Sequence, residues 1–202
     1  MTSTLVSHVD DASARETASA VVRARFDASN RVCEAFFAAE SDAIARACQA
    51  MAERFRTGGR LLVHAPPSRR SDVSHVVVEF MHPVVVGKRA LGALALEGEG
   101  QLALLGRPND IVLVLADGAP DAAARSLMTG ARGSGMLCLV MAGRSALGGR
   151  ASGGADSDGA PAGFEFVVAS GDACIVQEVH EMLYHVLWEL VHVFLDRSEP
   201  AA

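Results

Sequence analysis

Two groups of potential metal-ligating side chains occur at helical spacing in this sequence. His75 and Glu79 lie four residues apart in a predicted helix, so they share one face with about 6 Å between their Cβ atoms. Near the C-terminus, Gln177, Glu181 and His185 follow in four-residue steps along one side of another predicted helix. An imidazole and a carboxylate placed in this way can bind one divalent cation. Taken alone, each group is weak evidence, because a His/Glu pair on a helix is more often a solvated or structural pair than a metal site.

These side chains need elements that bring the two helices together. Apolar runs bounded by Gly, Pro or polar residues predict β-strands at 60–65, 90–96, 110–116, 136–142 and 164–170. Helical periodicity predicts helices at 13–39, 41–56, 71–81, 120–134 and 172–195. Four of the strands are nearly continuously apolar, as strands buried on both faces should be, whereas 164–170 alternates and suits an edge. The pattern predicts an α/β fold: a three-layer α-β-α sandwich with a mainly parallel five-stranded sheet and an N-terminal helical pair.

The chain is expected to form a single structural domain with two irregular segments. We expect residues 1–12 to be a flexible tail, 13–57 to be helices used in packing or oligomerisation, and 58–197 to be the α/β domain. Residues 143–163 contain seven Gly and almost no large apolar side chain. This composition is typical of a flexible surface loop, and a mobile lid is the alternative.

The composition excludes several classes of protein. Of the 202 residues, 50% are hydrophobic and 21% are charged, which is too apolar for a disordered chain. The net charge of −6 argues against direct binding to nucleic acid, which usually requires a basic face. No apolar run reaches the roughly 18 residues that cross a bilayer, and no signal peptide is visible. The four cysteines form no C-x-x-C pair, so we expect buried free thiols in a cytoplasmic protein without membrane contact.

The order and spacing of the motifs, over about residues 15–196, resemble one known family. The motifs are Asp72-x-x-His75-x-x-x-Glu79-Phe80, Arg89-Ala-Leu-x-Ala-Leu-x-Leu96, Asn109-Asp-Ile and Gln177-Glu-Val-His-x4-His185. They are similar to those of the SIS-domain sugar isomerases, specifically the phosphoheptose isomerase branch. This branch includes a tetrameric replication-initiator-associated protein.

The resemblance implies a metal site and a homotetramer. Members of the branch hold Zn²⁺ on four side chains whose positions fall here on His75, Glu79, Gln177 and His185, and all four residue types match. Another divalent transition metal is equally compatible with these ligands. In the isomerases the matching Glu and second His are also acid/base groups, which makes Glu79 and His185 the candidate catalytic residues. The alternative is a buried polar cluster that joins two helices.

The first phosphate-binding loop departs from the family pattern. The family has Gly-Asn-Gly-Gly-Ser after the first strand, whereas this chain has Ala65-Pro-Pro-Ser-Arg69. Pro66 and Pro67 have no N–H to donate to a phosphate. The side-chain charge of Arg69 and Arg70 is the remaining means of holding an anion at this loop.

The second phosphate-binding loop departs as well. The family usually has Ser-Thr-Ser-Gly-Asn-Ser, whereas this chain has Ala116-Asp-Gly-Ala-Pro-Asp121. Asp117 and Asp121 therefore bring negative charge to the place where a phosphate dianion is expected. The candidate ligand pocket consists of His64, Ser68, Arg69, Arg70, Asp72, Asp117 and Asp121.

Three functions remain compatible with this combination. The first is a metal-dependent, isomerase-like activity on a different ligand, such as a carbohydrate derivative, that is less anionic than the usual sugar phosphate or uncharged. The second is a metal-bearing accessory protein with a protein partner. The third is isomerisation of D-sedoheptulose 7-phosphate, with Arg69 and Arg70 replacing the backbone cradle. Whether the protein is an enzyme is left open by the sequence.

Overall fold

The computed structural model describes residues 11–83, 85–144 and 163–197. The predicted flexible loop at 143–163 lies outside these residues except at its ends. The predicted tail at 1–12 also lies outside them, except for two residues that belong to the first helix. The boundaries placed at 13–57 and 58–197 stay predictions.

Five parallel strands form one sheet with the order β2-β1-β3-β4-β5. The strands are β1 (Leu61–His64), β2 (Ala93–Ala95), β3 (Ile111–Leu115), β4 (Leu137–Gly143) and β5 (Gly163–Val168). The predicted parallel sheet is confirmed, and the alternating strand lies at an edge as predicted. Because the chain runs from β1 to β2 on one side and then to β3 on the other, the direction of winding switches between β1 and β3. Crevices at such switch points are the usual ligand sites of open parallel sheets.

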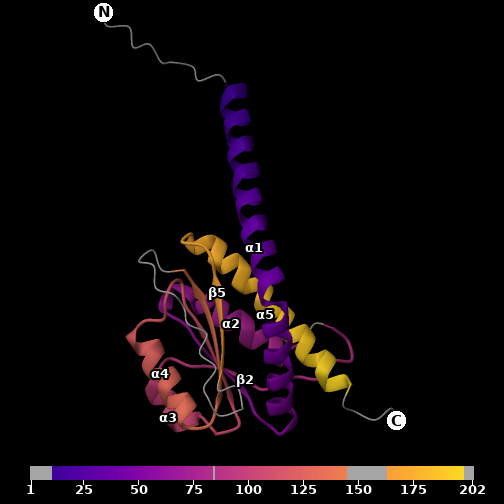
Figure 1. Ribbon diagram of the computed structural model, residues 1–202, viewed down its shortest axis with the longest axis vertical. Coiled ribbons are helices and arrows are strands. Elements are labelled where there is room, and N and C mark those ends of the chain that lie inside the picture. Colours follow the sequence, from indigo (N-terminus) through magenta and orange to yellow (C-terminus); the bar gives the residue numbers. More distant parts are fainter. Residues whose placement is uncertain (1–10, 84, 145–162, 198–202) are drawn as a thin grey trace, which may run out of the picture.

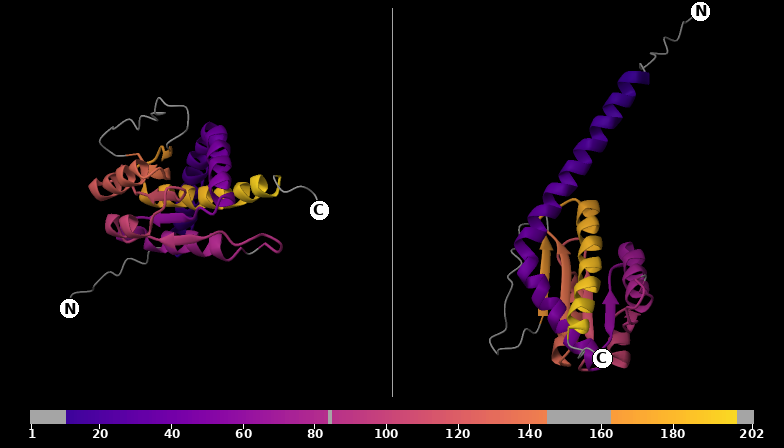
Figure 2. Two further views of the ribbon diagram at one scale, coloured as in Figure 1. Left: turned by 90° about the horizontal axis from the view of Figure 1, so that it is seen from below. Right: turned by 90° about the vertical axis from the view of Figure 1, so that its right-hand side faces the viewer.

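Helices cover both faces of the sheet, which confirms the three-layer sandwich (Figures 1 and 2). One layer contains α1 (Asp11–Arg56), α2 (Arg70–Met81) and α5 (Ala173–Asp196), and the other contains α3 (Glu99–Leu105) and α4 (Ala122–Gly133). A short 3-10 helix, η1 (Pro67–Arg69), leads into α2. Side chains alternate between the two cores: Leu113 of β3 packs with the first layer, and Val112 packs with the second. The seven-residue α3 is an element that the sequence pattern did not predict.

The N-terminal region is one helix, so the prediction of a helical pair is wrong. Helix α1 runs for 46 residues without a break. We placed the break before Ser41 because serine is a good N-cap, but no Pro or Gly precedes it. A cap residue inside a helix costs only about half a kcal/mol relative to Ala and does not end the helix by itself. Gly58 follows the true end of α1 and has φ +86°.

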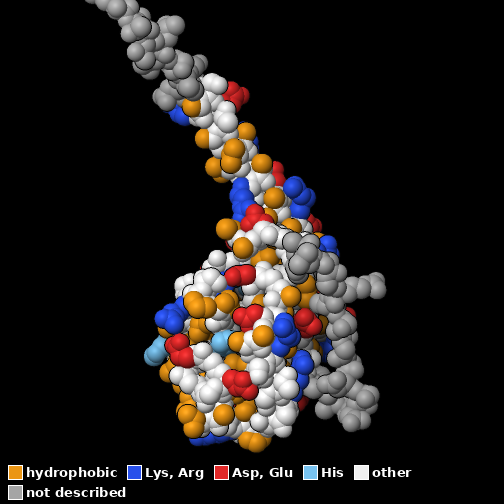
Figure 3. Space-filling view, turned by 90° about the vertical axis from the view of Figure 1, so that its left-hand side faces the viewer, with side chains coloured by type: hydrophobic (Ala, Val, Ile, Leu, Met, Phe, Trp, Pro, Cys, Tyr) orange, Lys and Arg blue, Asp and Glu red, His pale blue; other side chains and the backbone are white. Residues whose placement is uncertain are grey.

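The first half of α1 projects beyond the sheet, and its second half packs against α5 and β5 (Figure 1). Val21, Val22 and Phe26 on the projecting half are 63%, 68% and 65% exposed. Hydrophobic side chains are visible along this projection in Figure 3. Among the described residues, no helix combines the length and apolarity needed to cross a bilayer.

All four cysteines are unpaired, as predicted. Cys48 and Cys138 are buried, and Cys33 is partly buried. The prediction of burial is wrong for Cys174, which lies exposed in the first turn of α5, two residues after the N-cap Asp172.

Candidate functional site

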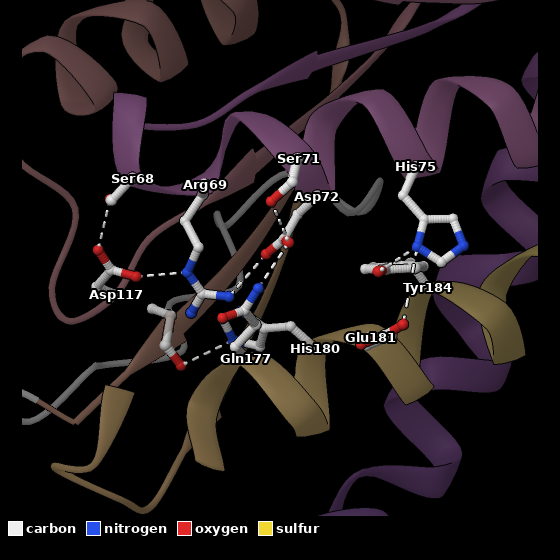
Figure 4. A network of polar contacts seen from close by, with 11 residues as sticks. Ser68, Arg69, Ser71, Asp72, His75, Asp117, Gln177, His180, Glu181 and Tyr184 are labelled. Carbon is white, nitrogen blue, oxygen red and sulfur yellow. Dashed lines mark hydrogen bonds and ion pairs between the residues drawn. The ribbon is translucent and has the colours of Figure 1, made fainter. Parts of the chain in front are cut away.

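A row of polar side chains lies between α2 and α5 (Figure 4). Helix α2 buries Val73, Val76 and Phe80 in the core. This packing leaves Asp72, His75 and Glu79 on the flank that faces α5. The facing side of α5 contributes Gln177, Glu181, Tyr184 and His185, and the loops after β1 and β3 contribute Ser68, Arg69 and Asp117.

Arg69 is the buried cation at one end of this row. Its side chain is 2% exposed, and its Nη1 donates to Asp72 Oδ2 at 2.8 Å. Its Nε donates to Asp117, and the Ser68 hydroxyl donates to the other oxygen of Asp117 at 2.9 Å. Burial alone lowers the pKa of Arg69, but Asp117 and Asp72 raise it above its ordinary value. The charge that we expected to be available for an external anion is therefore already bonded to two carboxylates of the protein.

Asp117 holds the complementary charge at this end. Burial alone raises the pKa of its carboxyl group, but the hydrogen bonds from Arg69 and Ser68 lower it below its ordinary value. Asp117 is thus an anion that belongs to the protein. It lies beside the loop after β1, at the switch point of the sheet.

Gln177 occupies the middle of the row. Its Nε2 donates to Asp72 Oδ1 at 2.8 Å, so the Asp72 carboxylate accepts hydrogen bonds from both Arg69 and Gln177. This contact ties α5 to the first turn of α2. The amide nitrogen of the predicted metal ligand Gln177 is therefore engaged in a bond between the two helices.

The other end of the row contains the remaining predicted ligands together with one further carboxylate. His75, Glu181 and His185 each offer a ligand atom, and these atoms lie within 4.8 Å of one another. Glu79 Oε1 accepts from His185 Nδ1 at 2.6 Å. We did not include Glu181 among the predicted ligands, although the four-residue steps from Gln177 to His185 pass through it.

The residues at this end suit a divalent cation. Imidazole nitrogen and carboxylate oxygen are the donors that zinc and related transition metals use in proteins. Glu79 Oε2 is buried and has no hydrogen-bond partner within the part of the chain that the structure describes. A buried carboxylate oxygen without a partner is costly, and a cation would remove that cost.

Tyr184 and His180 are two further buried groups beside the row. Tyr184 Oη lies 3.1 Å from His75 Nδ1. Burial, followed by nearby Glu181, raises the pKa of Tyr184, so its hydroxyl keeps its proton. His180 is fully buried, and burial lowers its pKa to about 4, so this ring is neutral near pH 7. Its Nε2 lies 3.4 Å from the carbonyl oxygen of Ala142, toward the sheet.

The other predicted pocket residues line a separate cavity of about 380 Å³ at the carboxyl ends of β1 and β2. His64, Arg70 and Asp121 contribute to its wall. Arg70 pairs with Glu97 at 3.3 Å, and Asp121 caps α4 by accepting from Ala124 N at 2.8 Å. By helical spacing, Arg70 lies on the flank of α2 away from the metal-ligating residues. The structure thus divides the predicted ligand pocket into a closed ion-pair network and an open cavity.

Curated proteins similar to this chain are phosphoheptose isomerases. The one from Roseiflexus sp. (strain RS-1) is 26% identical over 188 residues, which cover 84% of this chain and 89% of that protein. The one from Desulfovibrio desulfuricans (strain ATCC 27774 / DSM 6949 / MB) is 26% identical over 183 residues, which cover 82% of this chain and 83% of that protein. No family model matches the chain.

Solved structures with the same fold include phosphoheptose isomerases. GmhA from Neisseria gonorrhoeae has a TM-score of 0.72 at 18% identity, covering 86% of this chain and 98% of that chain. The phosphoheptose isomerase from Francisella tularensis has a TM-score of 0.68 at 24% identity, and the match covers 84% of this chain and 95% of that chain. A chain of a HobA-DnaA (domain I-II) complex from Helicobacter pylori has a TM-score of 0.59 at 9% identity, and the match covers 92% of this chain and 98% of that chain.

The parallel sheet and the helical layers define an α/β protein with the fold of the solved phosphoheptose isomerases. In sequence, the chain is similar to curated phosphoheptose isomerases, at 26% identity over more than four fifths of its length.

Proposed function

We propose that this protein is a metal-dependent, isomerase-like SIS protein whose ligand is a carbohydrate derivative without a phosphate group. The observation that carries the proposal is the internal pairing of Arg69. This guanidinium is 2% exposed and is bonded to Asp72 and Asp117. The cation that would attract a phosphate at the switch point is thus neutralised by the protein itself.

Electrostatics explains why an anionic ligand is disfavoured there. Two like unit charges about 4 Å apart repel by about 1 kcal/mol in water and by about 4 kcal/mol at an effective dielectric constant of 20. A phosphate that approached Arg69 would face the Asp117 carboxylate at this range. Pro66 and Pro67 in the same loop provide no N–H groups to offset the repulsion.

The chemistry proposed for the ligand is proton transfer between adjacent carbons. Glu79 and His185 share a hydrogen bond of 2.6 Å, and a carboxylate and an imidazole are usual general acid/base groups for such a transfer. His75, Glu79 and His185 would hold the cation, with Gln177 or a neighbouring donor completing the set. When bound, the cation would act as a Lewis acid that polarises a carbonyl oxygen. The acid/base roles of Glu79 and His185 are part of the proposal.

The second candidate is isomerisation of D-sedoheptulose 7-phosphate. It is favoured by the two curated relatives named phosphoheptose isomerase, which match 84% and 82% of this chain. It would require Asp117 to leave Arg69, so that the phosphate could take its place.

The experiment compares sedoheptulose with its 7-phosphate as ligands of the purified protein, with and without added Zn²⁺. We expect calorimetry to show binding of the unphosphorylated sugar and negligible binding or turnover of the phosphate ester. Clear turnover of the 7-phosphate would overturn the proposal in favour of the second candidate. Metal binding without binding of either sugar would point instead to an accessory protein of the kind that the HobA-DnaA complex represents.

A further inference from the structure

We infer that Glu181 supplies a carboxylate donor to the divalent-cation site, in the role that the sequence motif assigned to Gln177. The inference rests on the proposed metal-dependent function and deepens it, because it changes the donor set and thereby the class of cation. Glu181 is a half-exposed residue on α5, one helical turn before His185, and its carboxylate lies 3.8 Å from His75 Nδ1.

The first argument concerns the two residues that compete for this role. Gln177 Nε2 donates to Asp72 Oδ1 at 2.8 Å, and Asp72 is itself bonded to buried Arg69. The amide group of Gln177 is therefore already held by a contact between α5 and α2. Glu181 offers an oxygen that already lies within 4.8 Å of the ligand atoms of His75 and His185.

The second argument concerns the orientation of the two histidines. Metal-bound histidines almost always donate their other ring N–H to a partner that fixes the tautomer. His185 Nδ1 faces Glu79 Oε1 at 2.6 Å, and His75 Nδ1 faces Tyr184 Oη at 3.1 Å. With the Nδ1 atoms as donors, both rings keep a lone pair on Nε2. Two rings held in this way beside the Glu181 carboxylate form an arrangement suited to a cation.

The revised donor set has a different chemical character. With Glu181 included, the cluster contains two imidazoles and one carboxylate. The buried Oε2 of Glu79, which has no hydrogen-bond partner among the described residues, would add a second carboxylate. A second carboxylate in place of an amide makes the site harder and more negative. This favours first-row divalent cations that accept mixed oxygen and nitrogen ligation, of which Mn²⁺ and Zn²⁺ are the probes.

The test measures the affinity of the full-length protein for Mn²⁺ and for Zn²⁺ separately, by titration calorimetry. We compare wild type with Glu181→Gln, Gln177→Ala and Glu189→Gln. The last variant removes the same charge from an exposed position on the same helix. We expect Glu181→Gln to weaken binding at least about tenfold, whereas the other two stay within about threefold of wild type. Glu181→Asp keeps a carboxylate and should recover part of the loss.

The outcomes separate the inference from the proposed function. Weak binding by Gln177→Ala together with unchanged binding by Glu181→Gln would overturn the inference and leave the metal-dependent function standing. Failure of the wild type to bind either cation would overturn the metal-dependent function itself. The metal-induced rise in melting temperature is a second readout, and circular dichroism confirms that each variant is folded.

Discussion

A single arginine shows how one buried charge determines what a site accepts. Moving a guanidinium out of water costs several kcal/mol unless partners compensate for it. Arg69 obtains that compensation from Asp72 and Asp117. Its Nη2 has no hydrogen-bond partner among the described residues. The guanidinium therefore still has a donor for one more oxygen atom, but Asp117 takes the position that an external anion would need.

At the residue scale, we predict that Asp117→Ala makes the protein responsive to inorganic phosphate. The variant should lose about 1–3 kcal/mol of stability, because it leaves Arg69 with one carboxylate while the Asp117 side chain is 43% exposed. Phosphate should raise the melting temperature of this variant more than that of wild type, since its oxygens can replace the carboxylate on Arg69 and Ser68.

The matched control is Asp121→Ala, which removes the same charge from the same loop. Asp121 caps α4 through Ala124 N. Its loss should cost about 1 kcal/mol without any added response to phosphate. Equal phosphate responses in the two variants would contradict the assignment of Arg69 and Ser68 as the latent anion site.

Element by element, the position of the site depends on the turn between α1 and β1. Asn109 Nδ2 donates to the carbonyl oxygens of Arg54 and Thr57, each at 3.2 Å, and so joins the end of α1 to the start of β3. A Cβ at Gly59 would collide with the carbonyl oxygen of Asn109 and lie 2.9 Å from that of Arg54. This close approach aligns β1 with β3, and the carboxyl ends of those strands position the loops of the site.

At the element scale, we predict that Gly59→Ala destabilises the protein more than Gly58→Ala. The first change forces a methyl group into backbone atoms and should cost about 3 kcal/mol or more. The second places Ala at φ +86° in open space and should cost about 1–2 kcal/mol. Urea unfolding of both variants measures the difference. If the two losses were equal, left-handed backbone strain rather than the close approach would dominate this turn.

The shape of the whole molecule is set by the half of α1 that projects from the sheet. Val22 and Phe26 are four residues apart, so they share one face of the helix, and both are exposed. Large apolar side chains gathered on one exposed face usually mark an interaction surface. The homotetramer proposed from the sequence would cover this face with other copies of α1.

At the scale of the whole molecule, we predict a solution mass four times that of the 21.1 kDa chain. Phe26→Glu should lower the mass measured by light scattering, because it buries a charge in the interface between copies. Thr17→Glu adds the same charge on a different side of α1 and should leave the mass unchanged. A monomeric wild type, or an equal effect of both variants, would contradict the role assigned to this face.

The sequence alone determined the α/β class and the parallel sheet. It also determined that His75 and Glu79 lie on one face of a helix, because helical periodicity shows which side chains share a face. It did not show that α1 is continuous, because a favourable cap residue such as Ser41 also fits inside a helix. Helix α3 could not be predicted either, because seven residues are too few to show a helical pattern of apolar side chains.

Only the tertiary structure decided which side chains meet across elements. Spacing along α5 placed Gln177, Glu181 and His185 on one side, but it did not show which of them faces His75 and which faces Asp72. The loops after β1 and β3 each looked unsuitable for phosphate on sequence grounds. Arg69 of one loop is buried against Asp117 of the other, 48 residues further along the chain. The local sequence around either residue does not show such a contact, because the fold brings the two loops together.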